Sequence, residues 1–311
     1  ACIMIKCTLY FGNPAYLSLR DRQLEVHLRQ ASPSKVPSRT IPIEDIGVVL
    51  LDDPQITITH GALNALLEQN CALITCGASH LPSGLMLPLD GHSLQNERFR
   101  SQLDASLPLR KQLWQQTVQA KIRNQATLLA YVLQEPVPNM LAWARQVKSG
   151  DSENLEARAA AFYWRNLFIP LPDFTREREG SAPNSLLNYG YAILRAVIAR
   201  ALVSAGLLPT LGIHHHNKYN AYCLADDIME PYRPYVDLLV VEICEEEGFP
   251  TELTKEIKAR LLALPTLDVE IEEQRRPLML AATQTATSLL RCFTGDARRL
   301  AYPLLSCEPS D

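Results

Sequence analysis

Ile46-Gly-Val-Val-Leu-Leu51, followed directly by Asp52-Asp53-Pro54, is an uninterrupted apolar run that ends at a turn-forming triplet. An apolar run of this length between breakers predicts a buried β-strand. Downstream, Thr59 precedes the apolar positions of residues 62–67 and is suited to cap a helix. Residues 71–76 then return to a strand-like composition. This part of the chain is therefore predicted to mix strands with at least one helix.

Upstream of this run, apolar and polar residues alternate twice, in Tyr16-Leu-Ser-Leu19 and in Leu24-Glu-Val-His-Leu28. Alternation with a period of two predicts strands with one buried face. Residues 20–23, which lie between them, are predicted to form a turn. Residues 1–90 are therefore predicted to be a small β-rich domain.

The pattern changes after residue 90. Pro, Gly, Ser, His and Asn accumulate, which predicts a linker over residues 91–107. Beyond it, Trp114, Val118, Ile122 and Leu129 share one helix face, a pattern typical of core packing. We therefore predict an α+β protein in which the small N-terminal β-rich domain is followed by a larger all-helical C-terminal domain, residues 108–311.

The composition excludes two broad classes of protein. Of the 311 residues, 47% are hydrophobic and 21% are charged, so the chain can bury a core and is not globally disordered. Arg195 and Arg200 interrupt the longest hydrophobic region, so we expect no membrane-spanning segment. Eight scattered cysteines without a Cys-x-x-Cys pair favour reduced thiols over disulfides or a structural zinc site. Because no export signal is recognisable either, we expect a cytoplasmic protein.

Charge is unevenly distributed along the chain, whose formal net charge is -4. Residues 94–150 carry eight Lys or Arg against three acids, whereas residues 237–273 carry eleven acids against three bases. A basic segment of this kind is compatible with a phosphate-binding surface. Ordinary solvated helix faces explain the same counts.

Two stretches carry the candidate chemistry. The first is the alanine-rich helix Leu155-Glu-Ala-Arg-Ala-Ala-Ala-Phe-Tyr-Trp164, in which Glu156 lies at the edge of an apolar stripe. A carboxylate in that position must be paired, hydrated or bound to metal, because an isolated buried charge is costly. An ion pair is the simpler of these alternatives.

The second stretch joins Gly212-Ile-His-His-His216 to Asp227-Ile-Met-Glu230-Pro-Tyr-Arg-Pro234. On a helix, Asp227 and Glu230 are three residues apart and face the same way. Imidazole and carboxylate donors without thiolates favour magnesium or manganese, which support phosphoryl chemistry. Three adjacent histidines cannot all point inward, so the residues alone leave the identity of the imidazole ligand open.

In order and spacing, these stretches resemble the motifs of the Cas1 family, the integrase of CRISPR adaptation, and in particular the branch found beside type II effectors. The resemblance extends to the N-terminal strands at residues 16–19 and 43–52. Its C-terminal motifs are Glu156-Ala-Arg-Ala-Ala-Ala-Phe-Tyr-Trp164, Asn184-Ser-Leu-Leu-Asn188-Tyr-Gly-Tyr191, Gly212-Ile-His-His215 and Asp227-Ile-Met-Glu230-Pro-Tyr-Arg-Pro234.

The resemblance implies a dimerising β domain and a helical catalytic domain with one magnesium or manganese site. The implied ligands are Glu156, His215 and Glu230, the last in a position where family members often have aspartate. Asp227 matches an accompanying acid of less defined role, and His214 and His216 stay alternatives to His215. Further implied residues are the phosphate contacts Arg176, Arg178, Lys121 and Arg123, for which solvated surface positions are an equal alternative, and the packing residues Asn184, Asn188 and Tyr189.

The implied function is the insertion of short foreign double-stranded DNA into a CRISPR array. A 3′-hydroxyl of the fragment would attack a phosphodiester of the repeat beside the leader. The implied assembly is two homodimers bridged by a dimer of the small ferredoxin-like protein Cas2, with no membrane partner. Two rival functions are a structure-selective metal-dependent DNA nuclease, in which water replaces the 3′-hydroxyl, and a non-catalytic DNA-binding scaffold.

Overall fold

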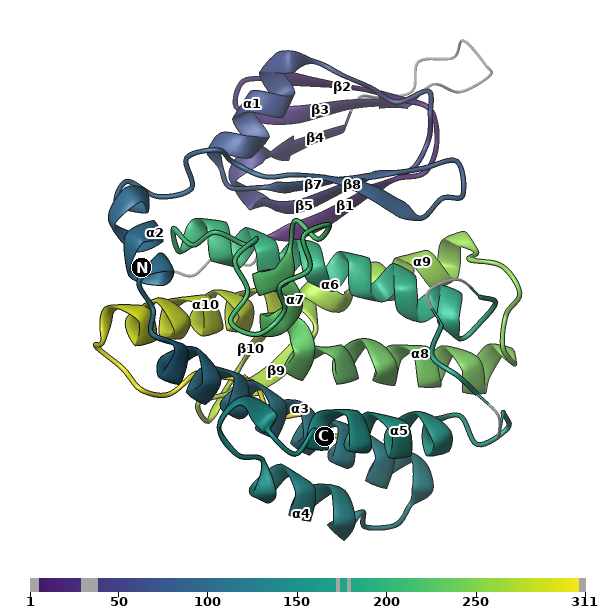
Figure 1. Ribbon diagram of the computed structural model, residues 1–311. Coiled ribbons are helices and arrows are strands. Elements are labelled where there is room, and N and C mark those ends of the chain that lie inside the picture. Colours follow the sequence, from purple (N-terminus) through teal and green to yellow (C-terminus); the bar gives the residue numbers. More distant parts are fainter. Residues whose placement is uncertain (1–5, 29–38, 172–173, 178–179, 308–311) are drawn as a thin grey trace. The chain divides into compact units, whose positions relative to one another are not determined.

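The computed structural model describes residues 6–28, 39–171, 174–177 and 180–307. It divides into two compact units, Ala1–Ser93 and Leu94–Asp311 (Figure 1). The first is rich in strands and the second is mostly helical. The predicted α+β class, with the β-rich part first, is therefore confirmed.

The first unit contains two four-stranded sheets, ordered β1-β5-β7-β8 and β4-β3-β2-β6. In one sheet β1, β5 and β7 run parallel, and β8 is antiparallel to β7. In the other, β2 and β3 form the predicted hairpin, whose turn residues Asp21 and Arg22 both have positive φ. The elements are β1 (Cys7–Phe11), β2 (Ala15–Arg20), β3 (Gln23–Leu28), β4 (Arg39–Pro42), the 3-10 turn η1 (Ile43–Asp45), β5 (Ile46–Leu51), β6 (Thr57–Ile58), α1 (His60–Glu68), β7 (Ala72–Cys76) and β8 (Pro82–Met86).

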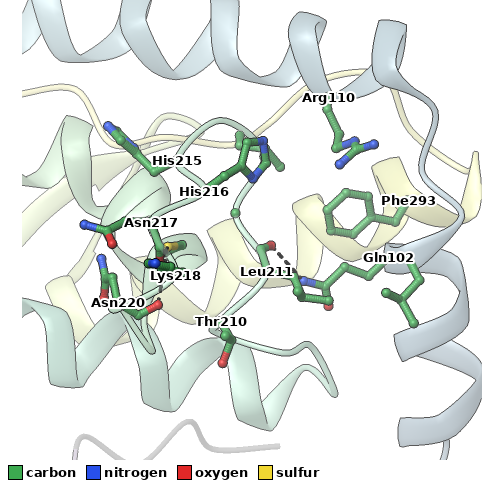
Figure 2. A pocket seen from close by; sticks show the side chains of 14 residues that line it. Gln102, Arg110, Thr210, Leu211, His215, His216, Asn217, Lys218, Asn220 and Phe293 are labelled. Atoms are coloured by element: carbon green, nitrogen blue, oxygen red, sulfur yellow. Dashed lines mark hydrogen bonds between the residues drawn. The ribbon is translucent and has the colours of Figure 1, made fainter.

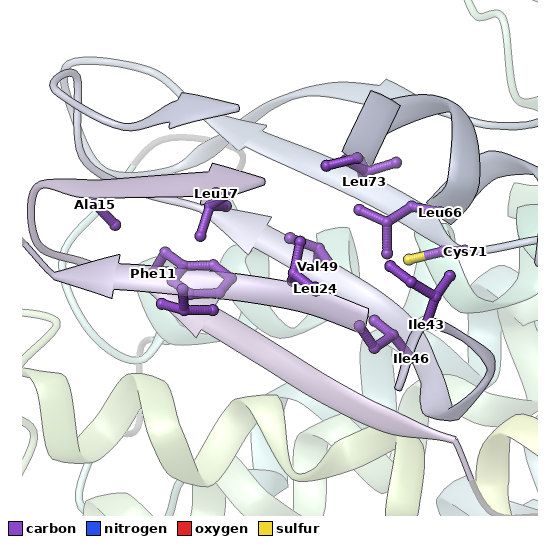
Figure 3. Close-up of a cluster of buried hydrophobic side chains, with 12 residues drawn as sticks. Phe11, Ala15, Leu17, Leu24, Ile43, Ile46, Val49, Leu66, Cys71 and Leu73 are labelled. Carbon is purple, nitrogen blue, oxygen red and sulfur yellow. The ribbon is translucent and has the colours of Figure 1, made fainter. Parts of the chain in front are cut away.

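The core of this unit lies between the two sheets and α1 (Figure 3). Leu17 and Leu24 come from one sheet, Val49 from the other and Leu66 from α1, and all four are fully buried. Strand β5 is buried from Ile46 to Leu50, as its continuous apolar sequence predicts. The hydroxyl of Thr59 accepts a hydrogen bond from the amide of Ala62, which confirms the predicted cap of α1.

The second unit is built mainly of helices around α3 and α6. Its helices are α2 (Gln95–Leu103), α3 (Leu107–Leu133), α4 (Pro138–Gln146), α5 (Leu155–Leu167), α6 (Asn184–Ser204), α7 (Cys223–Met229), α8 (Arg233–Glu247), α9 (Lys255–Leu262) and α10 (Leu278–Thr294). Shorter elements are the 3-10 turns η2 (Ser149–Asp151), η3 (Glu230–Tyr232) and η4 (Leu264–Thr266), and the hairpin strands β9 (Asp268–Ile271) and β10 (Gln274–Pro277).

The apolar stripe predicted on α3 is core, because Trp114, Val118, Ile122 and Leu129 are all buried. Helix α6 is long and apolar enough to cross a membrane, with a mean hydropathy of 1.4 over its most apolar window. However, 83% of that window is buried inside the protein, which is the environment of a core helix. None of the seven described cysteines is in a disulfide, as predicted.

Two features of the second unit differ from the sequence-based expectation. Residues 91–107, predicted to be a linker, contain α2, and the second unit begins at Leu94. The composition of α2 is polar, but the side chain of Gln102 is buried and donates to the carbonyls of Leu208 and Leu211. The C-terminal part, predicted to be all helical, contains the hairpin β9–β10, in which Val269 and Ile271 of β9 and Pro277 of β10 are buried.

Candidate metal centre

Glu156 lies in the first turn of α5, and its backbone is fixed from outside the helix. The two carboxylate oxygens of Asp151 accept the amides of Leu155 and Glu156, each at 2.9 Å. These bonds satisfy amides that have no partner within the helix, and the negative charge suits a helix N-terminus. The side chain of Glu156 is 27% exposed.

Glu230 lies at the joint between α7 and α8. Pro231 follows it and cannot donate the amide bond that would continue α7, so the chain forms the 3-10 turn η3 before α8 begins. The amide group of Asn124 on α3 donates to the carbonyl of Pro231 at 2.8 Å. The joint is thereby attached to α3, and the side chain of Glu230 is only 8% exposed.

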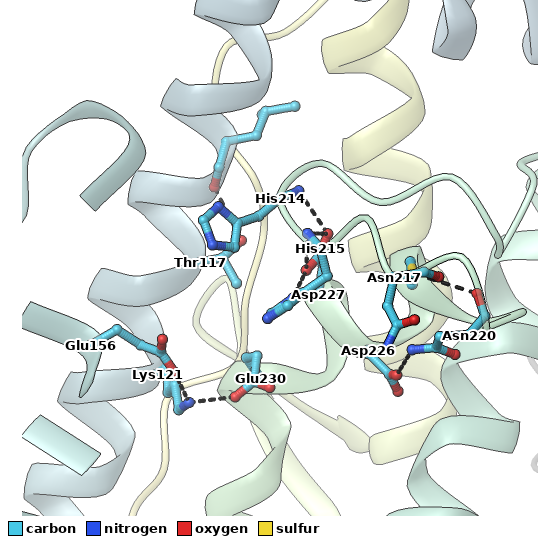
Figure 4. A network of polar contacts seen from close by, with 12 residues as sticks. Thr117, Lys121, Glu156, His214, His215, Asn217, Asn220, Asp226, Asp227 and Glu230 are labelled. Carbon is cyan, nitrogen blue, oxygen red and sulfur yellow. Dashed lines mark hydrogen bonds and ion pairs between the residues drawn. The ribbon is translucent and has the colours of Figure 1, made fainter. Parts of the chain in front are cut away.

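Lys121 of α3 lies between these two glutamates (Figure 4). Its Nζ is 2.5 Å from Oε1 of Glu156 and 2.5 Å from Oε2 of Glu230. The contact with Glu156 is a hydrogen bond, whereas Oε2 of Glu230 accepts no hydrogen bond from a described residue. On its other side, Glu230 lies 3.0 Å from Nε of Arg233. Two carboxylates thus converge on one cation.

The electrostatics keep Lys121 and Glu230 charged. Burial alone lowers the pKa of the Lys121 ammonium, but Glu230 and Glu156 outweigh it and raise that pKa above its ordinary value. Burial alone raises the pKa of Glu230, but Arg233 and Lys121 outweigh it and lower that pKa. A buried group of this kind stays ionised only because partners of opposite charge are in direct contact.

His215 is oriented by Asp227, which is fully buried on α7. The carboxylate of Asp227 contacts Nδ1 of the His215 ring and accepts the backbone amides of His214, at 2.9 Å, and His215, at 3.3 Å. The hydrogen bond with Asp227 is the main reason that the pKa of His215 is raised. Because Nδ1 is engaged, Nε2 is the ring nitrogen left for a ligand, the usual arrangement of a metal-binding histidine.

Gly212 permits this close approach. A Cβ at this position would lie 2.4 Å from the carbonyl oxygen of His215 and 2.7 Å from Oδ2 of Asp227. Both distances are too short for any side chain. The glycine is therefore needed for the histidine loop to reach Asp227.

The other two histidines have different surroundings. The ring of His214 stacks on Trp114 with centroids 4.1 Å apart and planes 1° apart. His216 lines a cavity of about 320 Å³ together with Arg110 and Lys218, and His215 lines the same cavity (Figure 2). Of the three, His215 is the one whose ring nitrogen contacts a buried carboxylate.

The sequence-predicted phosphate contacts fall in different places. Arg176 donates to the side-chain oxygens of Asn184, at 2.9 Å, and Asn188, at 2.6 Å, so it holds its own loop to α6. Arg123 is exposed on α3, whereas Arg178 lies outside the described residues. Lys121 is 7% exposed and paired with both glutamates, which differs from the surface position of a predicted phosphate contact.

Sequence reasoning missed three residues that support the site. Asn124 anchors η3, Arg233 faces Glu230, and Arg195 pairs with Asp226 at 2.6 Å to fix α7 against α6. Asn124 is a polar residue next to the apolar stripe of α3, and a polar side chain in that position could have been predicted to make a buried hydrogen bond. The partners of the two arginines are set by tertiary packing and carry no local signal.

The donor set offers oxygen and nitrogen atoms but no thiolate, which suits a hard divalent cation. Glu156 and Glu230 supply oxygens, one of them buried and without a hydrogen-bond donor, and His215 has a free Nε2. Among the described residues, no three His, Cys, Asp or Glu side chains are gathered closely enough to hold a metal as they stand. The ammonium of Lys121 lies between the two carboxylates instead.

Comparison with known proteins identifies the family. Residues 9–261 match the family model described as CRISPR associated protein Cas1. A CRISPR-associated endonuclease Cas1 from Neisseria meningitidis serogroup C (strain 8013) is 37% identical over 302 residues, covering 95% of both chains.

Solved structures share the fold. A casposase bound to integration product has a TM-score of 0.77 at 20% identity, covering 96% of this chain and 92% of the casposase. A chain of the Cas6-RT-Cas1–Cas2 complex has a TM-score of 0.71 at 21% identity, covering 94% of this chain and 35% of that one. The family match, the 37% identical relative and the shared fold agree, and this chain belongs to the Cas1 family of CRISPR-associated endonucleases.

Proposed function

We propose that this protein is a metal-dependent DNA integrase of CRISPR adaptation. It would join the 3′-hydroxyl of a short double-stranded DNA fragment to a phosphodiester of the repeat, with magnesium or manganese as cofactor. The observation that carries the proposal is the convergence of the Glu156 and Glu230 carboxylates on one cation. Each carboxylate comes from a different helical element. A buried ion pair adds little net stability, but rigid elements hold its charges in defined positions, as a metal site requires.

Three side chains would hold the metal: Glu156, Glu230 and His215 through Nε2. Bound there, a divalent cation polarises a phosphodiester oxygen and stabilises the charge that develops in transfer. Asp227 keeps the histidine ring in the tautomer with a free Nε2, because its carboxylate contacts Nδ1. Arg233 stays beside Glu230 and keeps that carboxylate ionised at the working pH.

The proposed partners are duplex DNA, a second copy of this chain and a Cas2 protein. Support comes from the fold shared with a casposase bound to integration product and with a chain of the Cas6-RT-Cas1–Cas2 complex. The reaction exchanges one phosphodiester for another, so it needs no external energy source.

A joining assay tests the proposal. The purified protein is mixed with its Cas2 partner, a duplex fragment with free 3′-hydroxyls and a supercoiled plasmid that carries leader and repeat, in manganese, magnesium or EDTA. Glu156→Gln removes a ligand charge at nearly constant shape. Glu153→Gln is the matched control, because Glu153 is exposed and pairs with the surface residue Lys148.

We expect the wild-type protein to join the fragment at the leader–repeat border only when metal is present. The Glu153→Gln variant should keep this activity. In Glu156→Gln the rate should fall by about 10²–10³-fold, because a bound metal contributes several kcal/mol to the barrier reduction. Metal-dependent cleavage without joining would favour the nuclease. DNA binding without any metal-dependent chemistry would favour the scaffold.

A further inference from the structure

We propose that Lys121 is an internal counter-ion of the metal centre: its ammonium holds Glu156 and Glu230 together when no metal is bound and must leave when the metal enters. The inference rests on the proposed function, since it takes the two glutamates as metal ligands. It assigns Lys121 a positioning role in place of the DNA contact that its sequence position suggested.

The first support is the geometry of the contacts. Nζ of Lys121 is equally close, at 2.5 Å, to one oxygen of each glutamate. A magnesium ion bonds to carboxylate oxygens at about 2.0–2.1 Å. A metal bound to the same two oxygens would therefore need the space that the ammonium fills, and two cations that close repel each other strongly in a buried site.

The second support is that a single cation serves both carboxylates. Nζ of Lys121 forms a hydrogen bond with Glu156 and an ion pair with Glu230, with three hydrogens to share between them. A divalent cation carries twice the charge and bonds to several carboxylate oxygens at once. The two carboxylates thus suit a divalent metal better than they suit the lysine.

The third support is the difference in rigidity between the lysine and its surroundings. Three residues further along α3, buried Asn124 bonds to the carbonyls of Pro231 and Pro303 and to the amide of Leu305. These bonds fix the helix against the Glu230 joint. The lysine side chain is a flexible four-carbon stem, so the ammonium can swing away while the backbone and both glutamates stay in place.

Lys121 would therefore have two opposing effects. It stabilises the metal-free protein, because without it the two carboxylates would repel each other. Arg233 would then neutralise Glu230 but not Glu156. Lys121 also weakens metal binding, because the metal must displace it. Removing the ammonium should lower the stability of the metal-free protein and raise its affinity for metal, a combination that a purely structural salt bridge does not produce.

The test uses the full-length protein and manganese alone as probe. Lys121→Met and Lys121→Gln remove the charge and keep much of the side-chain length, and Lys148→Met is the matched control at an exposed ion pair. Free manganese is measured by electron paramagnetic resonance to obtain Kd, and thermal unfolding is followed in EDTA and in manganese. Glu156→Gln reports whether the bound manganese occupies the proposed site.

We expect both Lys121 variants to bind manganese about tenfold more tightly than the wild type, a gain of about 1.4 kcal/mol. They should also unfold at lower temperature in EDTA and recover in manganese, whereas Lys148→Met should match the wild type. If a variant folds only with manganese, that result supports the proposal too.

Unchanged or weaker manganese binding in both variants would overturn the role of Lys121. The metal centre itself would stand if wild-type binding were still lost in Glu156→Gln. Absence of Glu156-dependent manganese binding in every protein, including the wild type, would overturn both the counter-ion and the proposed metal dependence.

Discussion

The two units bury different kinds of side chain. The centre of the first is apolar, with residues such as Leu17, Leu66 and Val49 packed between two sheets and a helix (Figure 3). Among the described residues, the first unit buries one charged side chain, Asp52, whereas the second buries seven, among them Lys121 and Glu230 with partners on separate helices (Figure 4). Apolar packing is non-directional and depends mainly on area and volume, whereas each buried charge depends on one particular partner. The first arrangement stabilises a fold, and the second also specifies a site.

The largest effect that we predict is in the apolar core. Leu66→Ala removes a fully buried side chain and should lower the free energy of unfolding by about 2–5 kcal/mol. Leu19→Ala in β2, where the side chain is 40% exposed, is the control and should change it by about 0.5 kcal/mol or less. Denaturant titration measures both, and equal losses would contradict the view of this core as tightly packed.

A buried carboxyl in the second unit should make stability depend on pH. Asp237 is fully buried and bonded to Tyr163 and Tyr191, and burial raises its pKa to about 6. Its protonated form is therefore favoured in the folded state, so its stabilising contribution is complete below pH 4 and is lost as the pH rises through about 6.

Asp237→Asn tests this assignment. Relative to this variant, the wild type should lose up to about 3 kcal/mol between pH 4 and 7, since each unit of pKa shift corresponds to about 1.4 kcal/mol. Urea unfolding across this pH range gives the free energy of unfolding of both proteins, and the contributions of the other titrating groups cancel in the difference between them. If that difference in free energy of unfolding does not change with pH, the pKa of Asp237 is not raised.

The next largest effect should come from the orientation of the His215 ring, which is expected to affect manganese affinity. Asp227→Asn weakens the contact that fixes the His215 ring and should lower manganese affinity by about 10–100-fold, the usual cost of losing such a partner. Calorimetric titration with manganese measures the loss. Affinity equal to that of the wild type would exclude His215, in this orientation, from the ligand set.

Two glycines differ in the space around them, and the one in open space carries the smallest effect that we predict. Gly212→Ala places a methyl group against Asp227 and should weaken manganese binding by displacing the histidine loop. Gly61→Ala in α1 meets nothing within 4 Å and should raise the free energy of unfolding by about 0.4–1 kcal/mol. Similar behaviour of the two variants, in melting and in manganese titration, would contradict the close approach at Gly212.

The sequence predicts the first unit well because its signals are local. Alternation at residues 16–19 and 24–28 and the apolar run at 46–51 correspond to β2, β3 and β5. It fails where an element buries little apolar surface. Helix α2 is mostly polar, and β9 alternates polar and apolar residues over only four positions, so neither produces a long apolar pattern.

The candidate site could be predicted only in part. Motif order picks out Glu156, His215, Asp227 and Glu230, and the structure places their side chains in one region of the second unit. The position of Lys121 could not be foreseen, because its partners are 35 and 109 positions away along the chain. A lysine is usually exposed, and only tertiary packing brings this one between two carboxylates.

The most direct measurement of the central claim is a crystal structure after soaking in manganese, with anomalous scattering to locate the ion. We predict one manganese ion bonded to Glu156, Glu230 and Nε2 of His215, with the Lys121 ammonium moved away from both carboxylates. A structure in which Lys121 still bridges the two glutamates while manganese binds elsewhere or not at all would contradict the account.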